Sequence, residues 1–345
     1  MKKKTILNLI KYHAEHNDQA FRQEAIEIAK EFDRNHDEEL AEYIMSLLSD
    51  VNTLSPQSRY FQSRFFTKIE GETKALPLPT ELESDIIGVM NAVNHHVGVN
   101  KFLFEGAPGT GKTESVRHIA RILERDLYRV DFESVIDSKL GQTARNIADL
   151  FTEICQDPRP VQSLYLFDEI DSIAMDRVNS QDIREMGRAT SAVLKGLDSL
   201  PEDVALIATT NLFSAFDKAL IRRFDAVIHF NRYSKQDLIE IGESILSGLL
   251  DRFSFAGRDM RLFRKIMNTQ DMLPYPGELK NILKTSVAFS DPGDSFSYLR
   301  KIWHSLQDGK GIFSPDELKK EGFTLREIEI LTGISKSQLS RKMNG

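Results

Sequence analysis

One stretch, residues 101–113, constrains this chain more than any other. It reads KFLFEGAPGTGKT, and from Gly106 to Thr113 it fits the pattern Gly-x-x-x-x-Gly-Lys-Thr. An apolar run with the composition of a buried strand comes directly before it. Glycines let the backbone wrap around an anion with its N–H groups pointing inward, and the helix predicted to follow offers its positive N-terminal end. The stretch therefore predicts a phosphate-binding loop; the alternative is a glycine turn with a chance lysine.

The side chains at the end of this loop add specific chemistry. Lys112 is suited to the β- and γ-phosphates of a nucleotide, and the Thr113 hydroxyl is suited to Mg²⁺. We therefore expect Mg²⁺ and a nucleotide with β- and γ-phosphates as ligands. The residues predicted to bind the nucleotide here are Gly106, Ala107, Pro108, Gly109, Thr110, Gly111, Lys112 and Thr113.

Composition limits the classes of protein to consider. The 345 residues carry a net charge of −7, which argues against coating by nucleic acid over the whole surface, and 41% are hydrophobic, enough for a sizeable core. Cys155 is the single cysteine, so no internal disulfide can form. No apolar run approaches the length of a membrane span, and the start of the chain lacks a signal-peptide core. We expect a cytoplasmic protein with no membrane partner.

Short apolar runs alternate with amphipathic helical segments in the middle of the chain. This alternation is typical of an α/β fold with a parallel sheet, here five-stranded, and helices on both faces. The predicted strands are Lys101–Glu105, Leu127–Phe132, Leu164–Phe167, Val204–Thr209 and Ala226–Phe230.

Breaks in the pattern divide the chain into six segments. We predict a helical N-terminal module (1–55), a linker (56–79), a large α/β subdomain (80–232), a helical lid (233–291), a connector (292–313) and a helix-turn-helix-like unit (314–345). In the N-terminal module, three helices are expected near 6–10, 21–32 and 40–48. This module either packs against the main domain or docks a substrate or adaptor protein.

Two acids end one predicted strand, and an asparagine ends the next. Asp168 and Glu169 follow Leu164–Phe167, and open α/β sheets place ligands at the carboxyl ends of their strands. Asp168 would hold Mg²⁺ together with Thr113, and Glu169 would activate the attacking water as a general base. Asn211, after Val204–Thr209, would orient that water, or would simply cap a turn.

Arg222 and Arg223 stand side by side after a short helical segment. Two adjacent side chains cannot both face the local phosphate site. Guanidinium groups stabilise the charge on a transferred phosphoryl group and can be supplied by another subunit. The alternative is a solvated pair at a helix end.

These motifs together resemble the classical clade of the AAA family within the AAA+ ATPases, and the resemblance covers residues 80 to 290. Within this clade the chain resembles the bacterial type. The resemblance implies an α/β core with a helical lid, a homo-oligomeric ring that is usually a hexamer, and Mg²⁺-dependent ATP hydrolysis between subunits. It assigns Lys112 and Thr113 to Walker A, Asp168 and Glu169 to Walker B, and Asn211 to sensor 1. Arg222 and Arg223 would be arginine fingers. Gly277 matches the glycine that replaces the sensor-2 arginine in classical members, beside the nucleotide.

One stretch departs from the family pattern. Lys139 stands where many classical members place an aromatic residue in the first pore loop, followed by Leu140 and Gly141. Lysine cannot grip a peptide as an aromatic ring does, so a pore that faces an acidic polymer, or a plain surface loop, becomes an alternative to threading of polypeptide. Arg188 resembles the basic residue that begins the helix behind the second pore loop.

The last 30 or so residues have the pattern of two capped helices around a glycine turn. Thr324 with Glu327 and Ser335 with Gln338 form expected capping boxes, and Gly333 ends the first helix. This pattern is similar to small bacterial helix-turn-helix domains. The predicted DNA contacts are Lys336, Gln338, Arg341 and Lys342; a packing or protein-binding role is the alternative.

We interpret the chain as an AAA ring motor that remodels or unfolds a macromolecular partner. A second hypothesis is a DNA-bound ATP switch, similar to transposition or replication helpers or to phage-defence components, whose output is assembly. A scaffold without hydrolysis fits poorly with the intact acid pair. The arrangement also resembles bacterial ATPases encoded beside subtilisin-like proteases, which makes such a protease a candidate partner.

Overall fold

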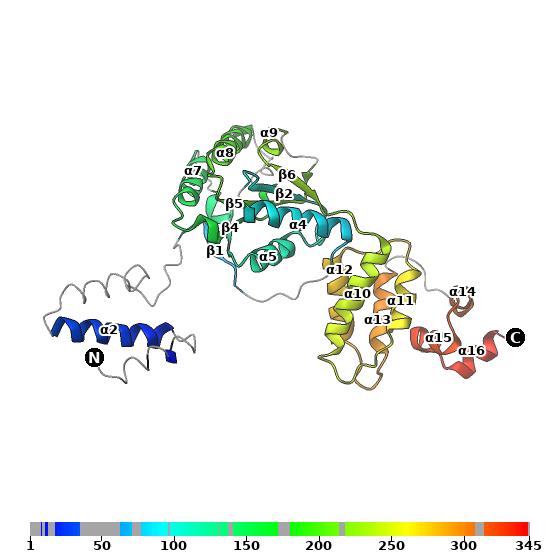
Figure 1. The fold of residues 1–345 in the computed structure, drawn as a ribbon. Helices are drawn as coiled ribbons and strands as arrows, with labels where there is room; N and C mark the ends of the chain where they lie inside the picture. Colours follow the sequence, from blue (N-terminus) through cyan, green and yellow to red (C-terminus); the bar gives the residue numbers. More distant parts are fainter. Residues whose placement is uncertain are drawn as a thin grey trace. The chain divides into compact units, whose positions relative to one another are not determined.

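The computed structural model describes residues 8, 11–12, 18–34, 63–70, 77–95, 97–130, 132–136, 141–171, 180–213, 218–307 and 314–343. The chain divides into two compact units, Met1–Gln62 and Ser63–Gly345 (Figure 1). In the first unit, helix α2 (Asp18–Arg34) buries Ala25, Ile28 and Ala29, as the helical period predicts. The apolar residues predicted for the helices near 6–10 and 40–48 lie outside the described residues.

The second unit is built on a six-stranded sheet of order β1-β3-β4-β5-β2-β6. All five predicted strands are present and run parallel to one another. The strands are β1 (Phe66–Lys68), β2 (Lys101–Glu105), β3 (Asp126–Val130), β4 (Ser163–Phe167), β5 (Ala205–Thr210) and β6 (Ala226–His229).

The additional strand, β1, comes from the segment predicted to be a linker. It pairs antiparallel with β3, with Phe66 opposite Val130, and Phe65 and Phe66 are buried beside it. Three residues are too few to reveal an alternating pattern, so the sequence did not indicate this strand. The prediction of a linker over 56–79 is therefore wrong for this part, and the sheet has an antiparallel edge.

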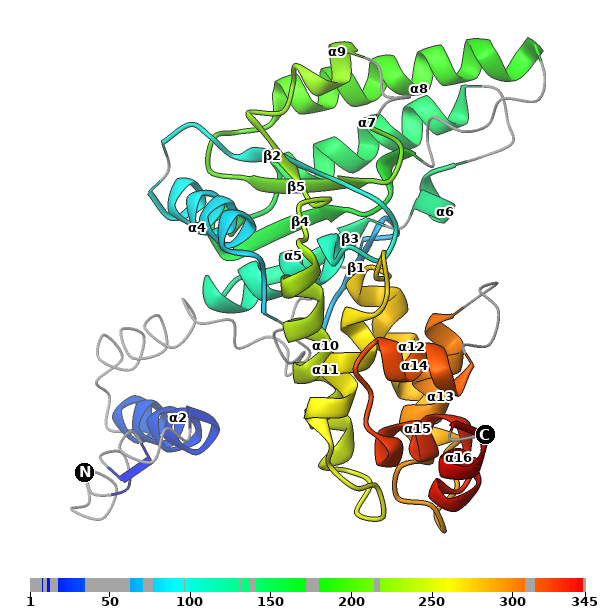
Figure 2. The ribbon, with the colours of Figure 1, turned by 90° about the vertical axis from the view of Figure 1, so that its right-hand side faces the viewer.

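Helices cover both faces of the sheet, as predicted (Figures 1 and 2). On one face, apolar residues of α4 (Thr80–His95) and α5 (Lys112–Ile122) share a core with alternate residues of the strands, such as Leu164 and Leu166. The opposite face of β4 meets α7 (Gln142–Cys155), where the rings of Phe151 and Phe167 lie 5.5 Å apart. The remaining elements are α6 (Phe132–Val135), η1 (Pro160–Gln162), α8 (Ser180–Ser199) and α9 (Lys218–Ile221).

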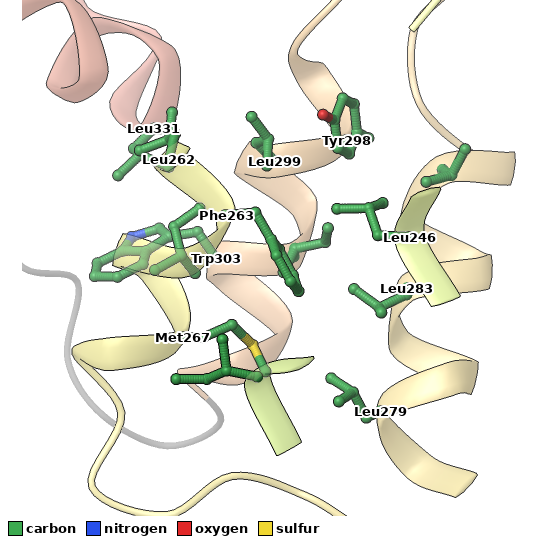
Figure 3. Packing of buried hydrophobic residues seen from close by; sticks show 14 of the residues in the cluster. Leu246, Leu262, Phe263, Met267, Leu279, Leu283, Tyr298, Leu299, Trp303 and Leu331 are labelled. Atoms are coloured by element: carbon green, nitrogen blue, oxygen red, sulfur yellow. The ribbon is translucent and has the colours of Figure 1, made fainter. Parts of the chain in front are cut away.

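A second core lies among the helices that follow the sheet. It contains apolar side chains of α10 (Lys235–Leu250), α11 (Met260–Asn268), α12 (Pro276–Ala288) and α13 (Ser297–Leu306) (Figure 3). The prediction of a connector over 292–313 is wrong for α13, because Tyr298, Leu299, Ile302 and Trp303 are all buried at helical spacing. The Asp291-Pro-Gly turn before this helix and the glycines after it concealed that period.

The C-terminal helices, α14 (Pro315–Lys320), α15 (Leu325–Thr332) and α16 (Lys336–Met343), complete the same core. Leu331 and Trp303 face this common interior (Figure 3), and the Trp303 ring meets Phe323 edge-on at 5.9 Å. The expected capping boxes at Thr324 and Ser335 form, and Gly333 is left-handed with φ 72°. The C-terminal helices are thus part of the lid's hydrophobic core.

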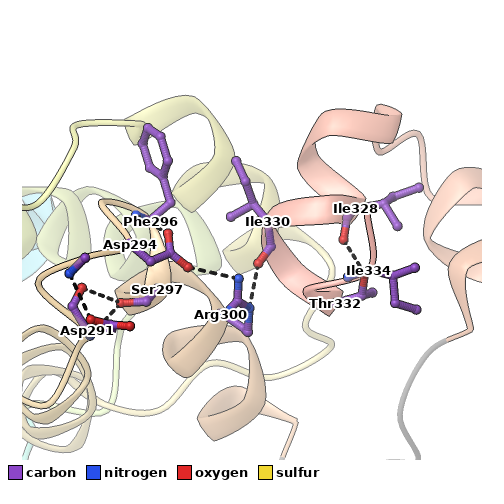
Figure 4. A network of polar contacts seen from close by, with 10 residues as sticks. Asp291, Asp294, Phe296, Ser297, Arg300, Ile328, Ile330, Thr332 and Ile334 are labelled. Carbon is purple, nitrogen blue, oxygen red and sulfur yellow. Dashed lines mark hydrogen bonds and ion pairs between the residues drawn. The ribbon is translucent and has the colours of Figure 1, made fainter. Parts of the chain in front are cut away.

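Polar contacts also join the lid helices α10–α13 to the C-terminal helices α14–α16. The Nε of Arg300 donates to the Ile330 carbonyl at 2.9 Å, and its Nη2 pairs with Asp294 at 3.1 Å (Figure 4). Lys265 Nζ lies 2.7 Å from Glu327 Oε2. Within the described ranges, no helix is both long and apolar enough to cross a bilayer.

Candidate functional site

The predicted phosphate loop joins β2 to α5. Gly109 and Gly111 have φ values of 79° and 95°, in the left-handed region that glycine adopts at little cost. A Cβ on Gly106, whose φ is 155°, would lie 2.9 Å from the Cβ of Phe230. The backbone shape of the loop therefore requires glycine at these three positions, and α5 begins directly afterwards at Lys112.

Lys112 is folded back into this loop. Its Nζ donates to the Gly106 carbonyl at 2.6 Å, to the Ala107 carbonyl at 3.1 Å and to Asn211 Oδ1 at 2.8 Å. The residue is only 6% exposed. Burial lowers the pKa of the Lys112 ammonium below its ordinary value, and nearby carboxylates offset part of this effect. These carboxylates belong to Asp171, Asp168, Glu169 and Glu105.

Asp168 lies beside Thr113, as the sequence predicts. Its Oδ1 accepts hydrogen bonds from Thr113 Oγ1 and from Thr209 Oγ1, each at 2.8 Å. A hydroxyl and a carboxylate are oxygen donors of the kind that Mg²⁺ takes, so the two residues fit this metal. Across the described part of the chain, no group of three or more His, Cys, Asp and Glu side chains could hold a metal ion. A Mg²⁺ ion here would need phosphate and water oxygens as its other ligands.

Glu169 and Asn211 also meet at this site. Asn211 Nδ2 donates to Glu169 Oε1 at 3.2 Å, while its Oδ1 accepts from Lys112. The sheet order explains the meeting, because β5 lies between β4 and β2 and all three strands are parallel. Their carboxyl ends therefore carry Asn211, the acids and the loop to one edge.

A cavity of about 300 Å³ opens over these groups. One wall comes from the sheet and the loop, and the other comes from α12 of the lid. Gly277 N–H donates to the Gly109 carbonyl at 2.7 Å, so the backbones of the two walls touch. The lining residues are Pro108, Gly109, Gly111, Lys112, Thr113, Glu114, Asp168, Glu169, Thr209, Asn211, Pro276, Gly277 and Lys280.

A smaller cavity, about 50 Å³, adjoins the first and shares Gly111, Glu114 and Pro276 with it. Its surface is mostly apolar. Its other lining residues are Pro77, Leu78, Ile86, Thr110, Ser115, His118, Tyr233 and Ile241. This apolar lining suits an aromatic ring.

The segment between β6 and α10 holds the phosphate loop, a role that the sequence did not indicate. Asn231 Oδ1 accepts from the Ala107 N–H at 2.8 Å, and the Tyr233 hydroxyl donates to the Thr110 carbonyl at 2.7 Å. Burial raises the pKa of Tyr233, which keeps this hydroxyl protonated as a donor. Their only sequence signal is their place directly before the lid. Lys280 and Thr209, which line the larger cavity, were also not predicted from the sequence.

The structure separates the two predicted arginine fingers. Arg223 Nε donates to Asp198 Oδ1 at 2.8 Å within the chain. Arg222 is exposed, and its side chain makes no hydrogen bond or ion pair with any residue that the structure describes. Only Arg222 is therefore free to reach a second molecule without first breaking an ion pair.

Of the predicted pore-loop residues, the structure describes Gly141 and Arg188. Lys139 and Leu140 lie outside the described residues, while Gly141 is the left-handed N-cap of α7, with φ 77°. Arg188 is exposed but does not begin its helix, because α8 starts at Ser180. The prediction of a helix start at Arg188 is thus wrong; the polar residues before it continue the helix.

The predicted DNA contacts lie on α16. Lys336, Gln338 and Arg341 are exposed, and the side chain of Lys342 lies outside the described part. The N–H of Lys336 donates to Glu329 Oε1 at 3.0 Å. A carboxylate thus occupies the end of the helix where a phosphate would approach.

Comparisons with known proteins agree with this geometry. Residues 102–232 match the model of the family described as ATPase family associated with various cellular activities, AAA. The chain is 38% identical over 133 residues to an uncharacterized AAA family ATPase, y4kL, of Sinorhizobium fredii, covering 39% of each protein. It is 33% identical over 173 residues to CD-NTase-associated protein 6 of Pseudomonas aeruginosa, covering 45% of this chain and 56% of the relative.

The fold also resembles a chain from the E. coli MS115-1 HORMA:CdnC:Trip13 complex, with a TM-score of 0.56 and 16% identity over 72% of this chain and 96% of the other. The matches to the two curated relatives span 39% and 56% of their lengths. The sheet order, the loop and the acid pair agree with the family match over residues 102–232. Residues 102–232 therefore form a domain that matches the AAA ATPase family.

Proposed function

We propose that this protein binds ATP with Mg²⁺ and hydrolyses it. The observation that carries the proposal is the convergence of Lys112, Thr113, Asp168, Glu169 and Asn211 on one cavity. These residues come from three separate places in the chain, and a role in packing alone does not explain a cation, two acids and an amide around an open space. The family match supports the same activity.

The side chains have distinct tasks in this proposal. Thr113 and Asp168 hold Mg²⁺, which would neutralise phosphate charge and polarise the γ-phosphate when bound. Lys112 is already buried among backbone carbonyls, so its ammonium can exchange those partners for phosphate oxygens without moving far. Glu169 takes the proton of the attacking water, and Asn211, which contacts both Lys112 and Glu169, orients that water.

The apolar cavity beside Thr110 and Gly111 is the proposed place of the adenine base. It shares Gly111 and Glu114 with the cavity that carries the acids, so one nucleotide would span the two cavities. Pro276 lines both cavities. Bound nucleotide would therefore contact the lid as well as the α/β subdomain.

The domain would act as a homo-oligomeric ring, as a hexamer in the simplest form, that remodels a protein partner. Arg222 supports this arrangement, because it is an exposed cation without a partner among the described residues of its own chain. In a ring it would reach the neighbour's γ-phosphate as an arginine finger. Among the similar proteins, the solved chain stands in a complex that contains HORMA and CdnC, which supports a protein as the partner.

The N-terminal module (1–55) would select that partner, either a substrate, an adaptor or a subtilisin-like protease. The lid and the C-terminal helices would move together in response to ATP, because they share one hydrophobic core. Work on the partner then follows from the relative motion of the α/β subdomain and this larger lid.

DNA binding through α16 is the second candidate function. Lys336, Gln338 and Arg341 are exposed on one short helix, which favours it, while the carboxylate of Glu329 at the helix start opposes it. The test is duplex DNA binding against salt by the full chain and by Lys336→Glu/Arg341→Glu. Removing the whole unit is a poor test, because Leu331 and Leu339 belong to the lid core. Equal binding by both proteins would exclude this role.

The central experiment measures ATP hydrolysis by the full chain at increasing Mg²⁺, with EDTA as the control. We expect turnover only with Mg²⁺. A chain that binds ATP but releases no phosphate at any Mg²⁺ concentration would contradict the proposal, and gel filtration with ATP would report on the ring.

A further inference from the structure

Strand β5 carries a second polar group at the site, Thr209, one residue after its pairing with β4 ends. β4 and β5 run parallel with Phe167 opposite Ala208, so Asp168, just after β4 ends, lies level with Thr209, which is still paired with Phe104 of β2. Thr209 has no exposed surface, although it lines the cavity that holds the acids. A buried hydroxyl at this place must find its hydrogen-bond partners within the protein.

The Thr209 hydroxyl binds both acids of the site. Its Oγ1 donates to Asp168 Oδ1 at 2.8 Å and accepts from the N–H of Glu169 at 2.8 Å. The directions are settled by chemistry, since a backbone N–H can only donate and a carboxylate can only accept. One hydroxyl therefore uses its single proton on one acid and a lone pair on the backbone of the other.

Glu169 needs such support because of its backbone. Its φ is 53°, in the left-handed region that residues with a side chain adopt only at a cost. This turn directs the Glu169 carboxylate to Asn211, on the side of the cavity where a water would attack. Without the Thr209 oxygen, the Glu169 N–H would lose its partner and the turn would be free to relax.

We propose that Thr209 is a positioning residue for ATP hydrolysis: it holds the Asp168 carboxylate in place for Mg²⁺ and the Glu169 backbone in place for the attacking water. This inference rests on the proposed ATPase function. It predicts that removing the hydroxyl lowers turnover and weakens the use of Mg²⁺ but leaves the binding of nucleotide itself unchanged. The reason is that Thr209 has no hydrogen bond to the phosphate loop or to Lys112 among the described contacts.

The test compares three variants of the full chain. Thr209→Val keeps the shape of the side chain and removes the hydroxyl, and Thr209→Ser keeps the hydroxyl. Thr210→Val is the matched control, because Thr210 is also fully buried on β5 but its hydroxyl accepts from the Leu212 N–H and touches neither acid. Thermal unfolding checks that each variant folds, and Thr209→Ala replaces the valine variant if that one does not.

In Thr209→Val we expect kcat to fall about 10- to 100-fold, the range for losing hydrogen bonds to charged or strained groups. The Mg²⁺ concentration for half-maximal turnover should rise several-fold, while binding of a fluorescent ATP analogue in EDTA should stay near the wild-type value. Thr209→Ser and Thr210→Val should keep wild-type kcat within about threefold, since neither loses the hydroxyl between the acids.

Two results would overturn the role of Thr209. One is a folded Thr209→Val with wild-type kcat and Mg²⁺ dependence. The other is a folded Thr209→Ser that is as impaired as the valine variant. Failure of the proposed function itself would look different, because the wild-type chain would then release no phosphate at any Mg²⁺ concentration.

Discussion

The backbone of Gly277 lies directly on the backbone of Gly109. The Gly277 N–H donates to the Gly109 carbonyl at 2.7 Å, and a Cβ on Gly277 would lie 2.8 Å from the Gly109 Cα. No side chain separates the lid helix α12 from the phosphate loop at this point. The conformation of the loop and the position of the lid are therefore linked through two glycines, one from each subdomain.

Gly277→Ala should weaken nucleotide binding, because the added methyl group must push the lid away from the loop. We expect the Kd for ATP to rise about tenfold or more, the effect of roughly 1.4 kcal/mol of lost contact or strain. Gly88→Ala on α4 is the control, since a Cβ there meets nothing within 4 Å. Fluorescence titration measures both; equal affinity in the two variants would contradict the link.

Lys280 should contribute to the affinity for ATP, because it lines the phosphate cavity from the lid. Its neighbour Lys284, one turn further along α12, is exposed and does not line that cavity. We expect Lys280→Met to weaken ATP binding several-fold. The difference in affinity from the wild type should shrink as salt concentration rises, because the lost attraction is electrostatic. Lys284→Met should match the wild type, and a similar loss in both variants would argue for a general charge effect.

Glu169→Gln and Lys112→Ala should separate hydrolysis from binding. The glutamine can still accept the hydrogen bond from Asn211, so the site keeps its shape and binds ATP, but it cannot take a proton from water. Lys112→Ala removes the buried cation and should abolish binding. Phosphate release and nucleotide titration distinguish the two, and full turnover by Glu169→Gln would show that another group is the base.

Arg222→Ala should lower kcat strongly with little change in stability, because the side chain is exposed and unpaired among the described residues. Arginine fingers contribute about 10³-fold or more to turnover. Arg223→Ala and Asp198→Ala should instead resemble each other, since they remove the same ion pair. Mixing Arg222→Ala subunits with Lys112→Ala subunits should restore part of the activity; a fully active monomer would contradict a role between subunits.

The pair of Lys265 and Glu327 should make the attachment of the C-terminal helices sensitive to pH. Burial alone would raise the pKa of Glu327, but hydrogen bonds from Lys265 and Thr324 more than offset it, and the net pKa is lowered. The stability from this group is therefore present above the ordinary glutamate pKa of 4.5 and lost as pH falls through the lowered value.

Accordingly, Glu327→Gln should cost about 1 to 2 kcal/mol at pH 7, and the difference from wild type should shrink in acid. Urea unfolding at pH 7 and below pH 4 measures it. Asp251→Asn, which breaks the exposed pair with Arg258, is the control and should have a smaller effect at pH 7. A Glu327→Gln cost that does not depend on pH would exclude the charge as its cause.

Much of this protein follows from the sequence because the signals are local. A capping box needs only a residue and its third neighbour, so Thr324 with Glu327 could be predicted without knowledge of the fold. The five parallel strands were predicted from apolar runs between amphipathic segments. The meeting of Lys112 with the acids followed from the rule that parallel strands end at a common edge.

Contacts between distant segments depended on the tertiary structure. Strand β1 exists because Phe66 finds Val130 across the sheet edge. Helix α13 belongs to the lid because Tyr298 and Trp303 are buried in the core that α10, α11 and α12 form. Arg222 and Arg223 have the same local pattern, and only the position of Asp198 distinguishes them. In each case the energy comes from burial or pairing with residues far along the chain, which no local pattern records.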